Sequence, residues 1–261
     1  MIYSRRTRFV LGLAGGFAAG VIFAFAVSEL NSGTYSSAVS SGNSGSSAED
    51  SGQAADGQSD ARLVTDNAAL LGSASDDWCL ALISESNPLD TDYVPPSLTR
   101  IDDSHSVDSR IAESLQQMLA DGRAKGLDMY VTSAYRTLST QTALFNNGVL
   151  TRMRAGMTPL EAYNNAKQSI ALPGTSEHAA GIAVDIIASQ YTELDERQAD
   201  TPEQQWLMAH CWEYGFILRY PQDSISVTGI TYEPWHYRYV GRNAAEEITK
   251  RGITLEEYLN E

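Results

Sequence analysis

Two residues of the segment "PGTSEHAAGIAVDI", residues 173–186, have the types and spacing of metal ligands. Asp185 stands inside an apolar run, residues 182–187, which predicts a short buried strand, and a carboxylate there loses its hydration unless a neighbouring charge compensates for it. His178 comes seven residues earlier, in the turn that leads into this strand. Because imidazole and carboxylate groups both bind zinc, a chain that curls back here can bring the two to one metal ion.

A third ligand and a general base are found in a second segment, "YEPWHYRYV". A catalytic zinc ion takes three protein ligands and leaves a fourth position for water, and His236, which alternates with tyrosines along a predicted strand, is the candidate third ligand. Glu233, three residues earlier, is the candidate base that takes a proton from the water and returns it to the departing amine. Water is then the nucleophile. The other two histidines, His105 in a polar turn and His210 on a helix, are expected to be structural.

Positive charge for an oxyanion or a substrate carboxylate is available in "SAYRTLSTQ", where Arg136 follows a predicted strand and precedes a helix that we expect Ser139 to cap. Each of these residues also has a structural interpretation: Asp185 could pair with a buried arginine, Glu233 could begin a turn before Pro234, and Arg136 could pair with any of the 33 acids. Taken together they meet the requirements of one chemistry, which favours the catalytic interpretation.

Three of these segments, "SEHAAGIAVDI", "EPWH" and "SAYRTLSTQ", resemble the D-alanyl-D-alanine carboxypeptidases of the VanY type. That family belongs to the LAS group of zinc peptidases, which also holds D,D-dipeptidases and L,D-carboxypeptidases. The resemblance extends over about residues 78–261, through "NPLDTDYVPPSL", "YGFILRYP" and "LEEYL". It implies a small α+β domain with an antiparallel sheet.

The resemblance also implies roles for individual residues. Glu233 would be the catalytic base, and Arg136 would be catalytic and substrate-binding, at the carbonyl or terminal carboxylate of the peptide. The implied Zn²⁺ ligands are His178, Asp185 and His236. Two further residues, Ser176 and Gln141, would help to bind the peptide end.

The implied activity is removal of the terminal D-alanine from peptidoglycan stem peptides or their precursors. An L,D-carboxypeptidase that trims tetrapeptide stems is an alternative, because the shape of the pocket rather than the metal ligands decides the substrate. A non-catalytic cell-wall-binding domain is a more distant alternative, and it is disfavoured because all three ligands and the base are present.

The elements that must position these residues can be read from capping chemistry and periodicity. An apolar stripe after Asp108 predicts a helix over residues 108–125. Thr158, Thr201 and Thr254 each begin a further helix, and the helix that begins at Thr201 should end at Gly215. Strands are predicted at residues 127–133, 182–187, 216–220, 227–232 and 235–240. Helices come mostly before strands, which favours an α+β fold, a small antiparallel sheet flanked by helices in a single catalytic domain.

The N-terminal quarter of the chain predicts a tether to a membrane. Residues 1–8 are a basic stub expected in the cytoplasm, and residues 9–27 are a run of 19 uncharged residues, near the roughly 20 that span a bilayer. Residues 28–75, rich in serine and glycine, predict a disordered linker, and residues 76–261 the catalytic domain. We expect a single-pass membrane protein with an extracytoplasmic catalytic domain. Secretion after signal cleavage near "AFA" is the alternative.

Charge and cysteine content limit the partners and the covalent structure. The net charge of −15 argues against binding to nucleic acid, which needs clustered lysine and arginine. In an exported protein the only two cysteines, Cys79 and Cys211, favour a disulfide over two buried thiols. A monomer is expected.

Overall fold

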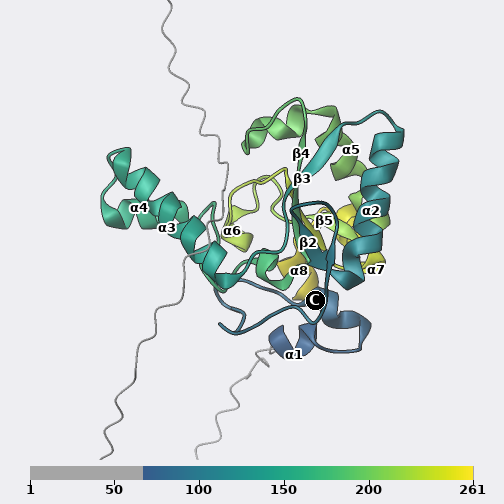
Figure 1. Ribbon diagram of the computed structural model, residues 1–261, viewed down its shortest axis with the longest axis horizontal. Coiled ribbons are helices and arrows are strands. Elements are labelled where there is room, and N and C mark those ends of the chain that lie inside the picture. The colour runs from purple at the N-terminus through teal and green to yellow at the C-terminus, as the bar shows by residue number, and fades with distance from the viewer. Residues whose placement is uncertain (1–66, 261) are drawn as a thin grey trace, which may run out of the picture. The chain divides into compact units, whose positions relative to one another are not determined.

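A computed structural model describes residues 67–260 of the chain (Figure 1). The basic stub, the apolar segment 9–27 and the first part of the linker therefore lie outside the described residues. Within residues 67–260 there is no helix whose length and apolar character would allow it to cross a membrane.

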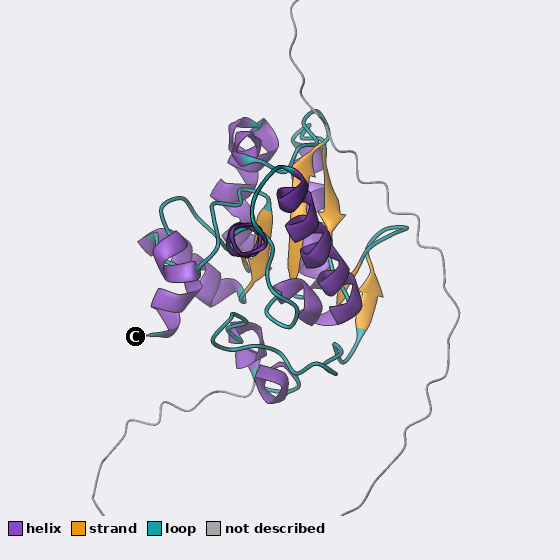
Figure 2. Ribbon diagram, turned by 90° about the vertical axis from the view of Figure 1, so that its left-hand side faces the viewer, coloured by secondary structure: helices purple, strands orange, loops and turns teal. Residues whose placement is uncertain are grey.

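An antiparallel sheet is the centre of the fold, as predicted, but it has four strands and not the five expected. Its strands follow the order β3-β4-β6-β5, and their bounds are Met129–Ser133, Ala183–Ala188, His236–Tyr239 and Phe216–Leu218. Every residue of β4 is buried, which matches its nearly continuous apolar sequence. A separate two-stranded sheet, which was not predicted, pairs β1 (Leu98–Arg100) with β2 (Ser106–Asp108) (Figure 2).

Two predicted helices cover this sheet and form the main core with it. α2 (Ser109–Ala124) begins at Asp108, whose side chain accepts a hydrogen bond from the Arg110 backbone, and its apolar stripe is buried. α5 (Pro202–His210) is capped by Thr201. Three 3-10 helices complete this half of the fold: η2 (Glu177–Ala180), η3 (Glu196–Asp200) and η4 (Cys211–Tyr214). A single helix was predicted from Thr201 to Gly215, whereas the α-helix ends at His210 and η4 continues from there. The stop at Gly215, whose φ of 84° is left-handed, is as predicted.

A helical hairpin of α3 (Leu138–Arg154) and α4 (Pro159–Ala166) projects from the body of the domain (Figure 1). The expected cap of α3 was placed too late in the sequence, since Thr137 rather than Ser139 accepts the bond from the Thr140 backbone. α4 begins as predicted, with a capping box between Thr158 and Glu161.

The C-terminal part adds α6 (Ile225–Thr228), α7 (Arg242–Arg251) and α8 (Leu255–Leu259). Thr254 caps α8 as predicted, and α7 was not predicted. The prediction of a strand at residues 227–232 is wrong. The chain makes one helical turn there instead, because the Gly229 backbone donates to Ile225 O at 2.9 Å and Gly229 takes a left-handed φ of 75°.

Two further expectations are corrected. The folded region begins earlier than residue 76, because α1 (Asn67–Leu71), followed by η1 (Asp76–Leu80), lies within the predicted linker. Leu71 is fully buried in the main core, and the Asn67 amide donates to Leu82 O and to Asn87 O at 3.0 and 2.8 Å. The expected disulfide is absent: Cys79 and Cys211 are separate thiols, both buried.

Candidate metal centre

Strand register brings the three predicted ligands together. Asp185 on β4 pairs directly with His236 on β6, so their side chains emerge side by side from the same face of the sheet. His178 lies on η2, and Gly181, which has a left-handed φ of 71°, returns the chain from η2 towards β4. One ligand atom from each of the three residues lies within 4.8 Å of the other two, and all three residues are buried.

The hydrogen bonds of the two histidines leave one ring nitrogen of each directed to Asp185. His178 Nδ1 donates to Ala134 O at 2.8 Å, so its Nε2, which is 3.3 Å from Asp185 Oδ2, keeps a lone pair. His236 uses Nε2 towards Glu177 at 3.3 Å, and its Nδ1 is 3.1 Å from Asp185 Oδ1. Two atoms of this group, His178 Nε2 and Asp185 Oδ1, have no hydrogen-bond partner in the described part of the chain although they are buried.

The ionisation of these groups also suits a divalent cation. Burial, assisted by the charge of Arg136, lowers the pKa of His178 to about 4, so its imidazole is neutral and able to bind a metal. Burial opposes ionisation of Asp185, but His178 and His236 outweigh it and lower the pKa of Asp185. Although burial disfavours its charged form, Asp185 and Glu177 raise the pKa of His236 to about 9. The acids around His236 thus favour a positive charge at this point, which a zinc ion would provide.

Glu233 lies beside the three predicted ligands. Its carboxylate is 3.7 Å from His236 Nδ1, and the residue is buried. Burial raises the pKa of Glu233 to about 8, with Asp185 adding to the rise and His236 and Arg136 opposing it. A cation bound to the ligands would lower this pKa towards neutrality. Such a carboxylate can accept a proton and release it again near pH 7, as a general base must.

Arg136 lies next to the same group. Its backbone N–H donates to His178 O at 3.1 Å, and its guanidinium acts electrostatically on Asp185 and on Glu233. Burial lowers the pKa of Arg136, and its Nε is buried without a hydrogen-bond partner among residues 67–260. An arginine in this condition is prepared to bind a carboxylate or carbonyl group.

The two predicted peptide-binding residues are both buried. Gln141, in the first turn of α3, donates its amide to Ala171 O at 2.7 Å, while its Oε1 is another buried atom for which the described chain offers no partner. Ser176 occupies the N-cap position of η2 and makes no capping hydrogen bond with its side chain. Both side chains therefore retain polar groups for a ligand.

A buried charge network behind His236 was missed in the sequence. Glu177 is fully buried, and its Oε1 accepts hydrogen bonds from Arg219 Nε and Arg238 Nη1, both at 2.7 Å, while its Oε2 faces His236. Arg219 also binds Glu256 with two nitrogens, at 2.9 and 2.7 Å. The signal that identified Asp185 was available here too, because Arg219 and Arg238 are charges within apolar strand sequences.

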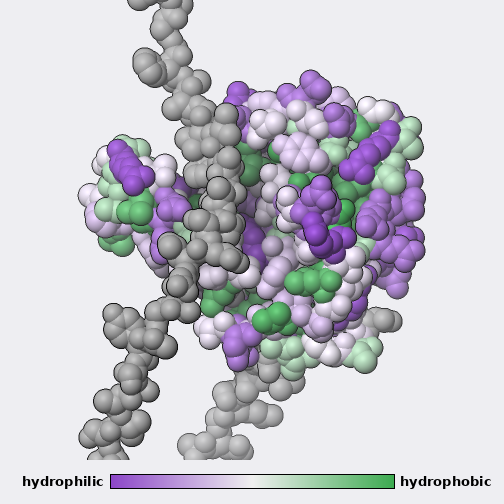
Figure 3. Space-filling view, in the orientation of Figure 1, coloured by the Kyte–Doolittle hydropathy of each residue, from purple (hydrophilic) through white to green (hydrophobic). Residues whose placement is uncertain are grey.

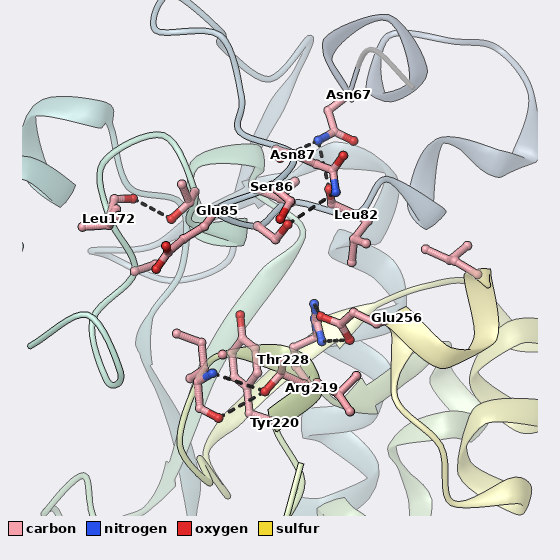
Figure 4. A pocket seen from close by; sticks show the side chains of 18 of the residues that line it. Asn67, Leu82, Glu85, Ser86, Asn87, Leu172, Arg219, Tyr220, Thr228 and Glu256 are labelled. Atoms are coloured by element: carbon pink, nitrogen blue, oxygen red, sulfur yellow. Dashed lines mark hydrogen bonds and ion pairs between the residues drawn. The ribbon is translucent and has the colours of Figure 1, made fainter. Parts of the chain in front are cut away.

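A pocket of about 960 Å³ adjoins the candidate metal centre but contains none of its ligands (Figure 4). Its walls come from residues 82–87, 167–175 and 225–230 and from α8, with the Arg219–Glu256 ion pair on one side. Tyr220 connects the two spaces, since it lines the pocket and its ring lies 4.9 Å from the ring of His236.

The remaining histidines have structural partners, as expected. His105 pairs with Asp102 at 2.9 Å in the turn between β1 and β2. His210 pairs with Glu213 at 2.6 Å at the end of α5. Neither belongs to the candidate metal centre.

Known proteins are similar to this chain in sequence and in fold. A D-alanyl-D-alanine carboxypeptidase of Enterococcus faecalis is 38% identical over 184 residues, which are 70% of this chain and 66% of that protein. The structure of VanYB in complex with D-alanine-D-alanine has a TM-score of 0.64 and 38% identity, and the match covers 70% of this chain and 98% of that one.

Two further solved structures are similar. A VanY variant in complex with Zn(II) has a TM-score of 0.64 at 37% identity, covering 70% of this chain and 99% of that chain. The LD-carboxypeptidase LdcB has a TM-score of 0.62 at 33% identity, covering 71% of this chain and 87% of that chain. The family model "VanY: D-alanyl-D-alanine carboxypeptidase" matches residues 104–242, which is more than half of the sequence. This chain belongs to the VanY family of D-alanyl-D-alanine carboxypeptidases.

Proposed function

We propose that this protein is a zinc carboxypeptidase that releases the C-terminal D-alanine from peptidoglycan stem peptides or their precursors. The observation that carries the proposal is the convergence of His178, Asp185 and His236 within 4.8 Å, with Glu233 beside them. Relatives named as D-alanyl-D-alanine carboxypeptidases, and a related structure in complex with D-alanine-D-alanine, support the substrate class.

His178, Asp185 and His236 would hold the zinc ion. The related VanY structure that contains Zn(II) supports the choice of metal, as does a donor set of two imidazoles and one carboxylate. Bound zinc supplies a Lewis acid that polarises a carbonyl oxygen and lowers the pKa of water.

Glu233 acts as the proton carrier of the reaction. Its carboxylate takes the proton from the attacking water and later gives it to the nitrogen of the departing D-alanine, as the same group serves first as base and then as acid. A pKa raised by burial suits both steps, because a carboxyl with an ordinary pKa would be a weak base and would rarely be protonated near pH 7.

Arg136 binds the negatively charged end of the substrate or the oxygen on which charge develops. The backbone of Arg136 is held by the bond to His178 O, and its unpartnered Nε supplies a donor. Gln141 and Ser176 complete the substrate site with polar groups that are buried.

An L,D-carboxypeptidase is the second candidate, and the similarity to the LD-carboxypeptidase LdcB favours keeping it. Mass spectrometry of pentapeptide and tetrapeptide stems incubated with the purified protein, with and without a chelator, separates the two. We expect loss of D-alanine from the pentapeptide and no release with the chelator. Cleavage of the tetrapeptide alone would establish the L,D activity, and a zinc-loaded protein that cleaves neither would indicate a wall-binding domain.

We also propose that the catalytic domain is tethered outside the cell membrane as a monomer. The apolar run at residues 9–27, preceded by Arg5, Arg6 and Arg8, supports a single span with the stub in the cytoplasm. Residues 28–66 would form the linker. Cell fractionation with protease treatment of intact cells tests this: a membrane-bound, protease-accessible domain supports the span, and release of a shortened protein supports cleavage of a signal.

A further inference from the structure

The end of the α3–α4 hairpin exposes a concentration of apolar side chains. Of the twelve large hydrophobic residues exposed in the described chain, five lie between residues 150 and 163. These five, with Arg152 and Arg154, are termed the hairpin tip: Leu150, Met153, Met157, Leu160 and Tyr163. Leu160 is 69% exposed, the highest value among the twelve. The lobe at the left of Figure 3 is this hairpin, and hydrophobic surface is visible on it.

The charge of the hairpin is opposite to that of the chain. Residues 150–163 contain two basic residues, Arg152 and Arg154, and one acid, Glu161, for a net charge of +1, whereas the whole chain carries −15. Arg154 lies in the last turn of α3, on the same side as Leu150 and next to Met153. Basic and apolar groups are thus combined at the tip.

Leu194 provides a contrast elsewhere on the surface. It is 50% exposed, but its neighbours in sequence are Glu193, Asp195 and Glu196. An isolated apolar residue among acids is ordinary for a protein surface. A cluster of five exposed apolar residues on a projecting element is not, and such clusters are typical of interaction sites.

We propose that the hairpin tip docks on the outer surface of an anionic phospholipid bilayer. Arg152 donates hydrogen bonds to Gly148 O, Asn165 and Ser169, so Arg154 is the arginine that such a surface would meet. Apolar side chains with Arg154 beside them match the hydrophobic and negatively charged layers of this surface. The inference rests on the proposed membrane tether. A predicted linker with a reach on the order of 30 Å keeps the domain at high local concentration near the bilayer, so a weak contact is enough to hold it there.

Docking would fix the orientation of the active site relative to the membrane. Arg136 immediately precedes the cap of α3, and Gln141 lies in its first turn, so the substrate site is at the base of the same helix whose far end forms the tip. With 17 residues, α3 holds the site roughly 25 Å from its far end.

Site-specific fluorescence in the full-length protein tests the proposal. An environment-sensitive dye is attached at Leu160→Cys, with Leu194→Cys as the matched control, and each protein is reconstituted in vesicles of phosphatidylglycerol and phosphatidylcholine with or without nitroxide-labelled lipid. The native thiols are 5% and 1% exposed, and the unmodified protein serves as the labelling blank. We expect quenching by nitroxide several-fold stronger at position 160 than at 194, and weaker in vesicles of phosphatidylcholine alone.

Equal quenching at the two positions overturns the proposal. So does a dye at position 160 that is shielded but insensitive to nitroxide lipid and responds to protein dilution, because a second copy of the chain then covers the tip. The double variant Met157→Ser/Leu160→Ser should lose the preferential quenching of a dye at Leu150→Cys and release D-alanine from a soluble pentapeptide at the unmodified rate. Failure of the docking is thereby distinguished from failure of the proposed activity, which would leave the unmodified protein inactive on that peptide.

Discussion

The two sides of His236 differ in how fully their polar groups are satisfied. Behind it, Glu177 receives hydrogen bonds from Arg219 and Arg238, and Arg219 is held in addition by Glu256. In front of it, His178 Nε2, Asp185 Oδ1 and other buried atoms have no partner in the region that the structure describes. Since leaving a buried polar group unpaired costs about 1 to 3 kcal/mol, the first side is a framework and the second is a place prepared for a ligand.

Within this buried charged cluster, the side with unsatisfied polar atoms is the side that can react. Strong charge alone does not distinguish the two sides, since both hold ionised groups that are buried. The unsatisfied atoms do distinguish them. Substitutions on the front side should therefore change the reaction more than the stability, and those on the back side should change stability and metal affinity together.

The largest effect is expected from Glu233→Gln, which keeps the volume of the side chain but removes the base. Turnover should fall on the order of 100-fold to 10,000-fold while zinc content is retained. The control is Glu246→Gln, at an exposed acid on α7. Steady-state rates and elemental analysis on the same samples measure the two quantities, and unchanged turnover in a zinc-loaded Glu233→Gln protein would exclude this role.

A somewhat smaller effect is expected from Arg136→Lys on the front side. The charge remains, but the two-pronged geometry and the unpartnered Nε are lost, so kcat/KM should fall on the order of 100-fold. Thermal stability should change little. Arg123→Lys, near the end of α2, is the matched control, and an equal loss in both variants would contradict a substrate-binding role.

On the back side, Glu177→Gln should weaken zinc binding roughly 10-fold to 100-fold, because it disturbs the group that orients His236. It should also lower the free energy of unfolding by about 3 to 5 kcal/mol, since two arginines lose a buried charge partner. Glu256→Gln is the control, because it weakens the pairing of Arg219 without touching His236. Chelator competition should separate the two variants, and identical zinc affinities would refute the orienting role.

The smallest effect is a pH dependence. Burial opposes ionisation of Glu177, but Arg219 and Arg238 outweigh it and hold the pKa of Glu177 well below 4.5. A depressed folded pKa stabilises the protein above the unfolded value, and that stability is lost as pH falls through the folded pKa. Thermal unfolding of the metal-free protein should thus show a decline below about pH 4.5 that is shallower in Glu177→Gln.

The exposed ion pair of Asp195 and Arg197 is a control for this pH dependence. Arg197 lowers the pKa of Asp195 to about 2, yet both side chains are well exposed, so solvent screens the pair and little stability depends on it. Asp195→Asn should therefore leave the acid limb of the unfolding curve almost unchanged. A change as large as that in Glu177→Gln would show that burial does not control the effect.

The sequence was informative where one local signal had one meaning. Threonine caps at Thr158, Thr201 and Thr254 predicted helix starts correctly because side chain and backbone interact within one turn. The conflict of a carboxylate in an apolar strand located Asp185. The three residues of the candidate metal centre could be named from residue types and spacing because metal binding demands particular side chains and the chain has only four histidines.

Other features depended on tertiary contacts. A strand was predicted at residues 227–232, but a helical turn and loop formed there, with Thr231 N bonded to Gln168 O at 2.8 Å. The partners of Arg219 and Arg238 come from segments far away in sequence, so their pairing with Glu177 could not be deduced from spacing. Likewise the separate thiols of Cys79 and Cys211 follow from packing and not from cysteine count.

Because Asp185 pairs directly with His236 across β4 and β6, metal binding requires the correct register of these two strands. Sliding one strand by a single residue would turn one of the two side chains to the opposite face and dismantle the chelate. Molecules assembled with that error could not capture the ion, and its binding energy would then favour only the properly aligned population. The ion would thus stabilise the correct strand register as well as take part in the reaction.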